Sequence, residues 1–170
     1  MSHIVRSAKH IKWLFIRRSQ QSLDVLALTE TWHDNSDDVS LRLSTPGSYA
    51  VVDAARGTGR GGGVAIVFRK HLRCSQLSLP TCQKLEAIGV RLITSSGPVI
   101  IVNIYQPGSE RPSSQFFEEP TGLLETLVVY SCPVVVGGDF NMRVHDARQL
   151  ANLLLSFDMS SKTPAILDKD

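Results

Sequence analysis

The most informative segment of this sequence is Val134-Val-Val-Gly-Gly-Asp-Phe-Asn141. Its three consecutive valines predict a short buried strand, and the two glycines allow a sharp backbone turn where that strand ends. Side chains two positions apart in an extended chain share a face, so Asp139 and Asn141 are expected to point the same way. Such a pair could hold an attacking water and a phosphate oxygen together. A strand-terminal Asx turn is the alternative, and it is the default for Asp-x-Asn alone.

Two other predicted strands also end in polar side chains. The apolar run 24–28 is followed by Glu30, and the run 99–104 is followed by Tyr105. Binding and catalytic groups commonly lie where a rigid scaffold gives way to loops. Each of these residues alone is more often structural. Because they occur together, they favour one shared site that contains Glu30, Tyr105, Asp139 and Asn141.

The rest of the pattern predicts an α/β domain over 1–158, followed by an unstructured tail, 159–170. Helices are expected at 9–21, at 114–130 with an interruption or a kink near Pro120 and Gly122, and at 147–157; 33–47 is expected to be a loop. Further strands are expected at 49–53, 64–68 and 85–92, with a turn at 95–98. Several strands follow one another as hairpins. This favours two packed mixed β-sheets flanked by helices over a doubly wound parallel sheet.

The net charge is only +2, but the charges are unevenly distributed. Segments 1–23 and 54–84 contain basic residues and no acidic ones, while the segment between them is acidic. Folded together, they could place a positive rim beside an acidic pocket, which suits a polyanion and a cation. A solvated surface of mixed charge remains the alternative. The candidate nucleic-acid-binding residues are Arg56, Arg60, Arg69 and Lys70.

The glycine-rich segment 57–63 resembles a phosphate-binding loop only superficially. Gly57-x-Gly59-x-x-Gly62 matches the dinucleotide fingerprint, but a predicted strand follows where that motif needs a helix. A P-loop is excluded because Gly62 is followed by Gly63-Val64 and not by Lys-Ser or Lys-Thr. Two interpretations stay open: a hairpin tip that carries Arg56 and Arg60 toward an anionic ligand, and a purely structural turn.

Composition limits the location of the protein. No apolar run approaches the ~20 residues of a membrane span, so we expect no membrane association. Three cysteines without a C-x-x-C spacing argue against a disulfide framework or a zinc site and favour a reducing compartment. The basic N-terminal segment could be a mitochondrial presequence, but its helical periodicity favours an ordinary first helix. We therefore expect an intracellular protein of the nucleus or cytoplasm.

Four segments resemble, in order and spacing, the endonuclease/exonuclease/phosphatase family. They are Leu28-Thr-Glu-Thr-Trp32, Arg60-Gly-Gly-Gly-Val-Ala65, Val102-Asn-Ile-Tyr-Gln-Pro107 and Val136-Gly-Gly-Asp-Phe-Asn141. The resemblance covers about 4–158, and the branch that looks most similar is the endonuclease domain of non-LTR retrotransposon polyproteins. It implies a four-layer sandwich of the deoxyribonuclease I type. It also implies Mg²⁺-dependent hydrolysis of DNA, with Mn²⁺ as a substitute ion and no small-molecule cofactor.

The resemblance also implies roles for individual residues. Glu30 matches the metal ligand of the family, and Asp139 matches the group that positions or deprotonates the attacking water. Asn141 matches an amide that contacts the scissile phosphate, and Tyr105 matches a phosphate-binding hydroxyl. Glu86 matches a frequent acidic position without an assigned role. In-line attack by water would leave 3′-hydroxyl and 5′-phosphate ends.

The sequence departs from the family pattern at both ends. Ile4 occupies the position of a metal-side Asn, and neither the terminal Ser-Asp-His motif nor its upstream Asp occurs. His145-Asp146 has the reverse order and lies too near Asn141 to substitute. We therefore expect a domain truncated at its C-terminus, with impaired turnover. The alternatives are a non-catalytic nucleic-acid-binding remnant and an inactive retroelement fragment.

Overall fold

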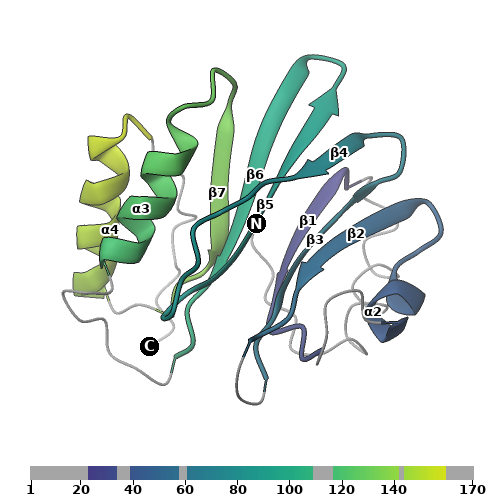
Figure 1. Ribbon diagram of the computed structural model, residues 1–170, viewed down its shortest axis with the longest axis horizontal. Helices are drawn as coiled ribbons and strands as arrows, with labels where there is room; N and C mark the ends of the chain where they lie inside the picture. Colours follow the sequence, from purple (N-terminus) through teal and green to yellow (C-terminus); the bar gives the residue numbers. More distant parts are fainter. Residues whose placement is uncertain (1–22, 34–38, 58–60, 109–116, 142–143, 160–170) are drawn as a thin grey trace, which may run out of the picture.

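The computed structural model describes residues 23–33, 39–57, 61–108, 117–141 and 144–159, which form two β-sheets packed face to face (Figure 1). The first sheet is antiparallel, with the order β1 (Val25–Thr29), β3 (Val64–Arg69) and β2 (Tyr49–Ala54). The second sheet has the order β4 (Arg73–Gln76), β5 (Glu86–Thr94), β6 (Gly97–Tyr105) and β7 (Val134–Asp139). Its last pair, β6 and β7, is parallel. The predicted two-sheet α/β sandwich is confirmed.

Strand β3 is apolar on both faces because both faces are covered. Val64, Ile66 and Phe68 belong to the core between the sheets, together with alternate residues of β5. The other face of β3 packs beneath the short helix α2 (Val39–Ser44), whose buried residue is Leu41. Continuous burial of this kind explains why 64–68 is an unbroken apolar run and not an alternating one.

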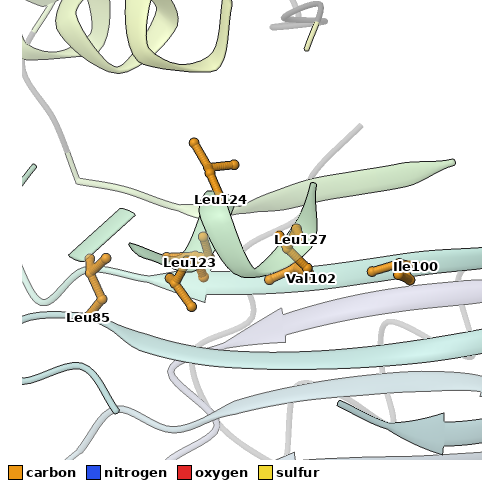
Figure 2. Close-up of a cluster of buried hydrophobic side chains, with 7 residues drawn as sticks. Leu85, Ile100, Val102, Leu123, Leu124 and Leu127 are labelled. Carbon is orange, nitrogen blue, oxygen red and sulfur yellow. The ribbon is translucent and has the colours of Figure 1, made fainter. Parts of the chain in front are cut away.

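The outer face of the second sheet carries α3 (Glu118–Leu127) and α4 (Val144–Ser156). Figure 2 shows Ile100 and Val102 of β6 beside the leucines of α3. Residues of α4 join the same cluster, among them Leu153 and Leu154. The chain crosses through α3 between β6 and β7, as a parallel pair of strands requires. The helices therefore lie outside the sheets, and the molecule is layered as expected.

The structure differs from the sequence-based expectations at three places. A helix, α2, lies within the expected loop 33–47, because burial of Leu41 stabilises a segment that has little helical signal of its own. Strand β4 was not predicted: it is short and polar, and it forms by pairing along β5. Helix α3 continues through Pro120, which lies in its first turn, where a missing N–H costs no helical bond.

The ends of two strands also differ from the predicted ones. Strand β7 continues through both glycines to Asp139 instead of stopping at Val136, and β6 begins at Gly97 and not after Pro98. The expected helix 9–21 lies outside the described residues, as does 160–170 of the expected tail.

Candidate active site

The four residues predicted to share a site come to one edge of the molecule. Glu30 directly follows β1, whose last residue, Thr29, pairs with Val64 at the start of β3. In the second sheet, Tyr105 pairs with Glu86 on one side and with Asp139 on the other. The ends of β1, β6 and β7 therefore meet the starts of β3 and β5, and the site is assembled from both sheets.

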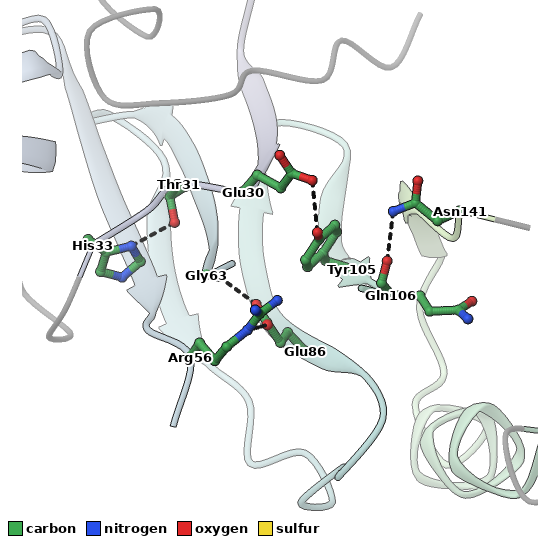
Figure 3. A network of polar contacts seen from close by, with 9 residues as sticks. All are labelled: Glu30, Thr31, His33, Arg56, Gly63, Glu86, Tyr105, Gln106 and Asn141. Atoms are coloured by element: carbon green, nitrogen blue, oxygen red, sulfur yellow. Dashed lines mark hydrogen bonds and ion pairs between the residues drawn. The ribbon is translucent and has the colours of Figure 1, made fainter. Parts of the chain in front are cut away.

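Glu30 and Tyr105 join the two sheets at this edge. The Tyr105 hydroxyl donates to Glu30 Oε1 at 2.8 Å (Figure 3). Glu30 has a φ of +53°, in the left-handed region that residues other than glycine rarely adopt. Such a conformation persists only where its surroundings enforce it, and it is common at functional sites.

The environment of Tyr105 keeps its hydroxyl protonated. Burial, together with the hydrogen bond to Glu30 and the charge of that carboxylate, raises the pKa of Tyr105 to about 12. The charge of Glu86 acts in the same direction, while the nearby Arg56 opposes it. Tyr105 is therefore a hydrogen-bond donor throughout the neutral pH range.

Asp139 and Asn141 flank the end of β6. The backbone N–H of Gln106 donates to the carbonyl oxygen of Asp139 at 2.9 Å, which extends the parallel ladder by one step. Asn141 has a φ of +44°, so the extended geometry predicted for Asp139–Asn141 is wrong. Its N–H donates to Asp139 Oδ1 at 3.1 Å, as in the Asx turn that was the alternative. Its side-chain Nδ2 donates to the Gln106 carbonyl at 2.7 Å.

Arg56 is the one described basic candidate at this edge. Its Nε donates to Glu86 Oε1, and its guanidinium carbon lies 5.9 Å from the centroid of the Tyr105 ring. Glu86 Oε2 accepts the N–H of Gly63 at 2.5 Å. Glu86 thus orients Arg56 beside Tyr105, a pairing that a local sequence pattern could not indicate.

The other basic candidates are not brought to this edge. Arg60 lies outside the described residues. Arg69 ends β3 and lies over the Tyr49 ring at 4.5 Å, and Lys70 follows it. Because β1 and β3 are antiparallel, this end of the sheet is opposite the one that carries Glu30. A role for Arg69 and Lys70 in nucleic-acid binding stays a prediction.

The glycines of the β2–β3 loop allow a close backbone approach. Gly63 has a φ of +86°, and its carbonyl accepts the N–H of Thr31 at 3.2 Å. A Cβ at Gly63 would lie 2.5 Å from Thr31 Oγ1, which is too close for any other residue to fit without rearrangement. This geometry explains the need for glycine at position 63, while the loop tip, 58–60, lies outside the described residues and both interpretations of it stay predictions.

A buried polar chain behind Glu30 was not predicted. Thr31 Oγ1 lies 2.6 Å from His33 Nδ1, and His33 Nε2 lies 3.0 Å from Asp53 Oδ2, with the His33 and Asp53 side chains only 3% and 2% exposed. Asn103, also buried, donates to the carbonyls of Leu28 and Ala65 across the sheets. The available signal for Asn103 was a single amide within the apolar run 99–104.

The oxygen atoms at this edge suit a hard cation. Mg²⁺ is usually held by one or two carboxylates and completes its shell with waters and substrate phosphates. Glu30 offers such a carboxylate, and Asp139 lies next to its partner Tyr105. Among the described residues, no three His, Cys, Asp or Glu side chains could together hold a metal.

The sequence matches a known protein family, and the fold matches solved structures. Residues 9–157 match the endonuclease/exonuclease/phosphatase family, which is most of the chain. The chain belongs to this family. No curated protein matches the sequence. Among the residues described in the family domain, no helix is long and apolar enough to cross a membrane.

Three solved structures show the same fold at low sequence identity. The endonuclease domain of TRAS1, a telomere-specific non-LTR retrotransposon, has a TM-score of 0.67 at 15% identity, and the match covers 92% of this chain and 70% of that one. The human Nocturnin catalytic domain has a TM-score of 0.60 at 20% identity, covering 91% and 70%. TDP2 from D. rerio with a single-strand DNA product has a TM-score of 0.54 at 16% identity, covering 93% and 61%. The chain thus covers 61–70% of the length of these three solved chains.

Proposed function

We propose that this chain is a retrotransposon-type endonuclease that hydrolyses phosphodiester bonds of DNA with Mg²⁺. The proposal rests mainly on the 2.8 Å hydrogen bond from Tyr105 to Glu30, which joins the sheets beside Asp139. Two similar structures support a nucleic-acid substrate, since one is a retrotransposon endonuclease domain and another holds single-strand DNA product.

Each residue at the edge would contribute a different interaction. Glu30 would hold the ion, which supplies charge neutralisation at the phosphate. Asp139, which is half-buried and pairs with Tyr105 across the strands, would position or deprotonate the attacking water. In-line attack by that water would break the bond to the 3′ oxygen and leave 3′-hydroxyl and 5′-phosphate ends.

The two hydrogen-bond donors differ in what substrate binding requires of them. The Tyr105 hydroxyl has one proton and donates it to Glu30, so contact with a phosphate requires that it exchange partners. The Asn141 amide has two N–H donors and uses one for the Gln106 carbonyl. Asn141 can therefore keep its position and still donate its second N–H to a phosphate oxygen.

We expect slow turnover from these 170 residues alone. They contain no Ser-Asp-His sequence, and Ile4 stands where the family pattern has an Asn. Loss of one preorganised charge-stabilising group commonly costs ~10²–10³ in rate, although such losses are not additive.

Nicking of a supercoiled plasmid tests the proposal. We expect slow nicking in Mg²⁺ and none in EDTA, and a loss of ~10²-fold or more in Glu30→Gln and Asp139→Ala. Glu125→Gln is the matched control, because Glu125 is exposed on α3. Nicking that Asp139→Ala leaves unchanged would refute the assignment. Salt-sensitive DNA binding without any cleavage would support a non-catalytic nucleic-acid-binding role instead.

A further inference from the structure

We infer that Trp32 is a stacking platform for an unstacked nucleobase next to the phosphate site. The inference rests on the proposed nucleic-acid substrate. The Trp32 side chain is 55% exposed, although tryptophan is usually largely buried. It follows Glu30 by two residues, a chain distance of at most ~7 Å. The Cα atoms of Trp32 and of the proposed metal ligand are therefore near neighbours, and the exposed Trp32 is available to a base beside the phosphate bound there.

The backbone holds this side chain in a fixed place. The backbone N–H of Trp32 donates to the Gly62 carbonyl at 2.8 Å, and the φ of Trp32, +53°, again lies in the left-handed region. Its neighbours on both sides are anchored inside the protein, because Thr31 and His33 are buried and lie 2.6 Å apart through their side chains. A rigidly held aromatic ring loses little conformational entropy when a base stacks on it.

One side of the indole lies against backbone. A Cβ at Gly61 would come within 3.3 Å of the indole carbons Cε2 and Cζ2, so the absence of a side chain there makes room for the ring. With Gly61 against one side and more than half of the side chain exposed, the remainder of the ring is open to a ligand.

A nucleobase is the ligand that fits this surface. Every base has a flat π-face, so stacking on an aromatic side chain does not depend on the base sequence of the nucleic acid. Bases within a duplex are already stacked on their neighbours, so Trp32 can receive only a base that is unpaired or turned out of the helix. The platform thus predicts a preference for DNA that is single-stranded or locally opened at the cleavage point.

Equilibrium binding of short labelled single-stranded DNA tests the inference. All proteins carry Asp139→Ala so that the DNA stays intact in Mg²⁺. We expect Trp32→Ala to weaken binding ~10-fold, Trp32→Phe to retain most of it, and Leu43→Ala, which removes another exposed apolar side chain, to leave it unchanged. Thermal unfolding of each variant shows whether it is folded.

A scan with one abasic residue locates the stacked base. The abasic residue is moved along the DNA, and at one position it should weaken binding to the parent protein but not to Trp32→Ala. Equal affinity of the parent and Trp32→Ala would overturn the inference and leave the proposed function standing. The inference is also overturned if Trp32→Ala binds more weakly than the parent by the same factor wherever the abasic residue stands. If the parent protein binds no single-stranded DNA, the inference is overturned, and plasmid nicking still decides the proposed function.

Discussion

At the scale of single residues, Gly138 sets the backbone conformation directly before Asp139, the last residue of β7. Gly138 has a φ of +139°, and a Cβ at this position would overlap the carbonyl oxygen of Ile104. At Gly137, a Cβ would meet nothing within 4 Å. We expect Gly138→Ala to lower the free energy of unfolding by ~3 kcal/mol or more, because backbone must move. Gly137→Ala should change it by less than ~1 kcal/mol. Urea denaturation measures both, and equal losses in the two variants would contradict this reasoning.

The raised pKa of Tyr105 predicts how stability depends on alkaline pH. A tyrosine in the unfolded chain ionises near pH 10, whereas the pKa of Tyr105 in the folded protein is about 12. Between these values the unfolded state has lost this proton and the folded state has kept it, so stability falls as pH rises. Below pH 10 both states are protonated, so the stabilisation from this hydroxyl is fully present and does not change with pH. Tyr105→Phe should therefore lose less stability than the parent between pH 10 and 12 in urea denaturation. A parallel decline would show that Tyr105 is not responsible.

The residues of the site were predictable to different degrees. Glu30, Tyr105 and Asp139 could be placed because each follows a strong apolar run, and a strand end fixes a location. The hydrogen bond from the Asn141 side chain to the Gln106 carbonyl and the contact between Arg56 and Glu86 could not. Both depend on partners 30 or more residues away in the chain, about which a local pattern carries no information.

At the scale of elements, Glu119 attaches the start of α3 to the segment before β5. Its carboxylate accepts the backbone N–H groups of Gln83, Lys84 and Leu85 at 2.7–3.1 Å. We expect Glu119→Ala to cost ~1–2 kcal/mol of unfolding free energy, since bonds to a charged acceptor are lost at a partly exposed position. Glu118→Ala is the matched control, being exposed in the same helical turn.

A cysteine reports on the same contact. Burial, together with the charge of Glu119 and a hydrogen bond to it, raises the pKa of Cys82 to about 11. In Glu119→Ala this thiol should react faster with a thiol reagent near pH 8, because more thiolate is present. An unchanged rate in a variant that is destabilised would mean that Glu119 stabilises the segment without influencing Cys82.

Predictability at this scale follows the amount of apolar burial within an element. The long apolar strands can be predicted from the sequence because their own side chains form the core. Helix α2 and strand β4 contribute little to the core, and other elements dictate their structure: α2 has one buried residue, and β4 has none. Neither could be recognised before its partners were in place.

At the scale of the whole molecule, Asn103 connects the two sheets through the core. It is fully buried on β6, and its Nδ2 donates to the Leu28 carbonyl at 2.6 Å and to the Ala65 carbonyl at 3.2 Å. Asn103→Leu keeps the size of the side chain but removes both bonds. We expect it to cost ~2 kcal/mol or more of unfolding free energy, because buried carbonyls lose a partner.

Asn152→Leu, at an exposed position on α4, is the control for this substitution. Since Asn103 precedes Tyr105 by two residues, its loss should also reduce plasmid nicking more than its cost in stability alone explains. A destabilised variant with full nicking would show that the sheets keep their alignment without this amide.

The strand pairing also implies an order of folding. The pairs β2–β3, β4–β5 and β5–β6 join neighbours in the chain, whereas β1 must find β3 and β7 must find β6 across long intervening segments. Closing a longer loop costs more entropy, so these two pairs should form late. They are also the strands that deliver Glu30 and Asp139. In pulsed hydrogen exchange, amides of β5 and β6 should become protected before those of β7, and simultaneous protection would contradict this order. A nascent chain would then pass through most of its folding before the candidate site is assembled.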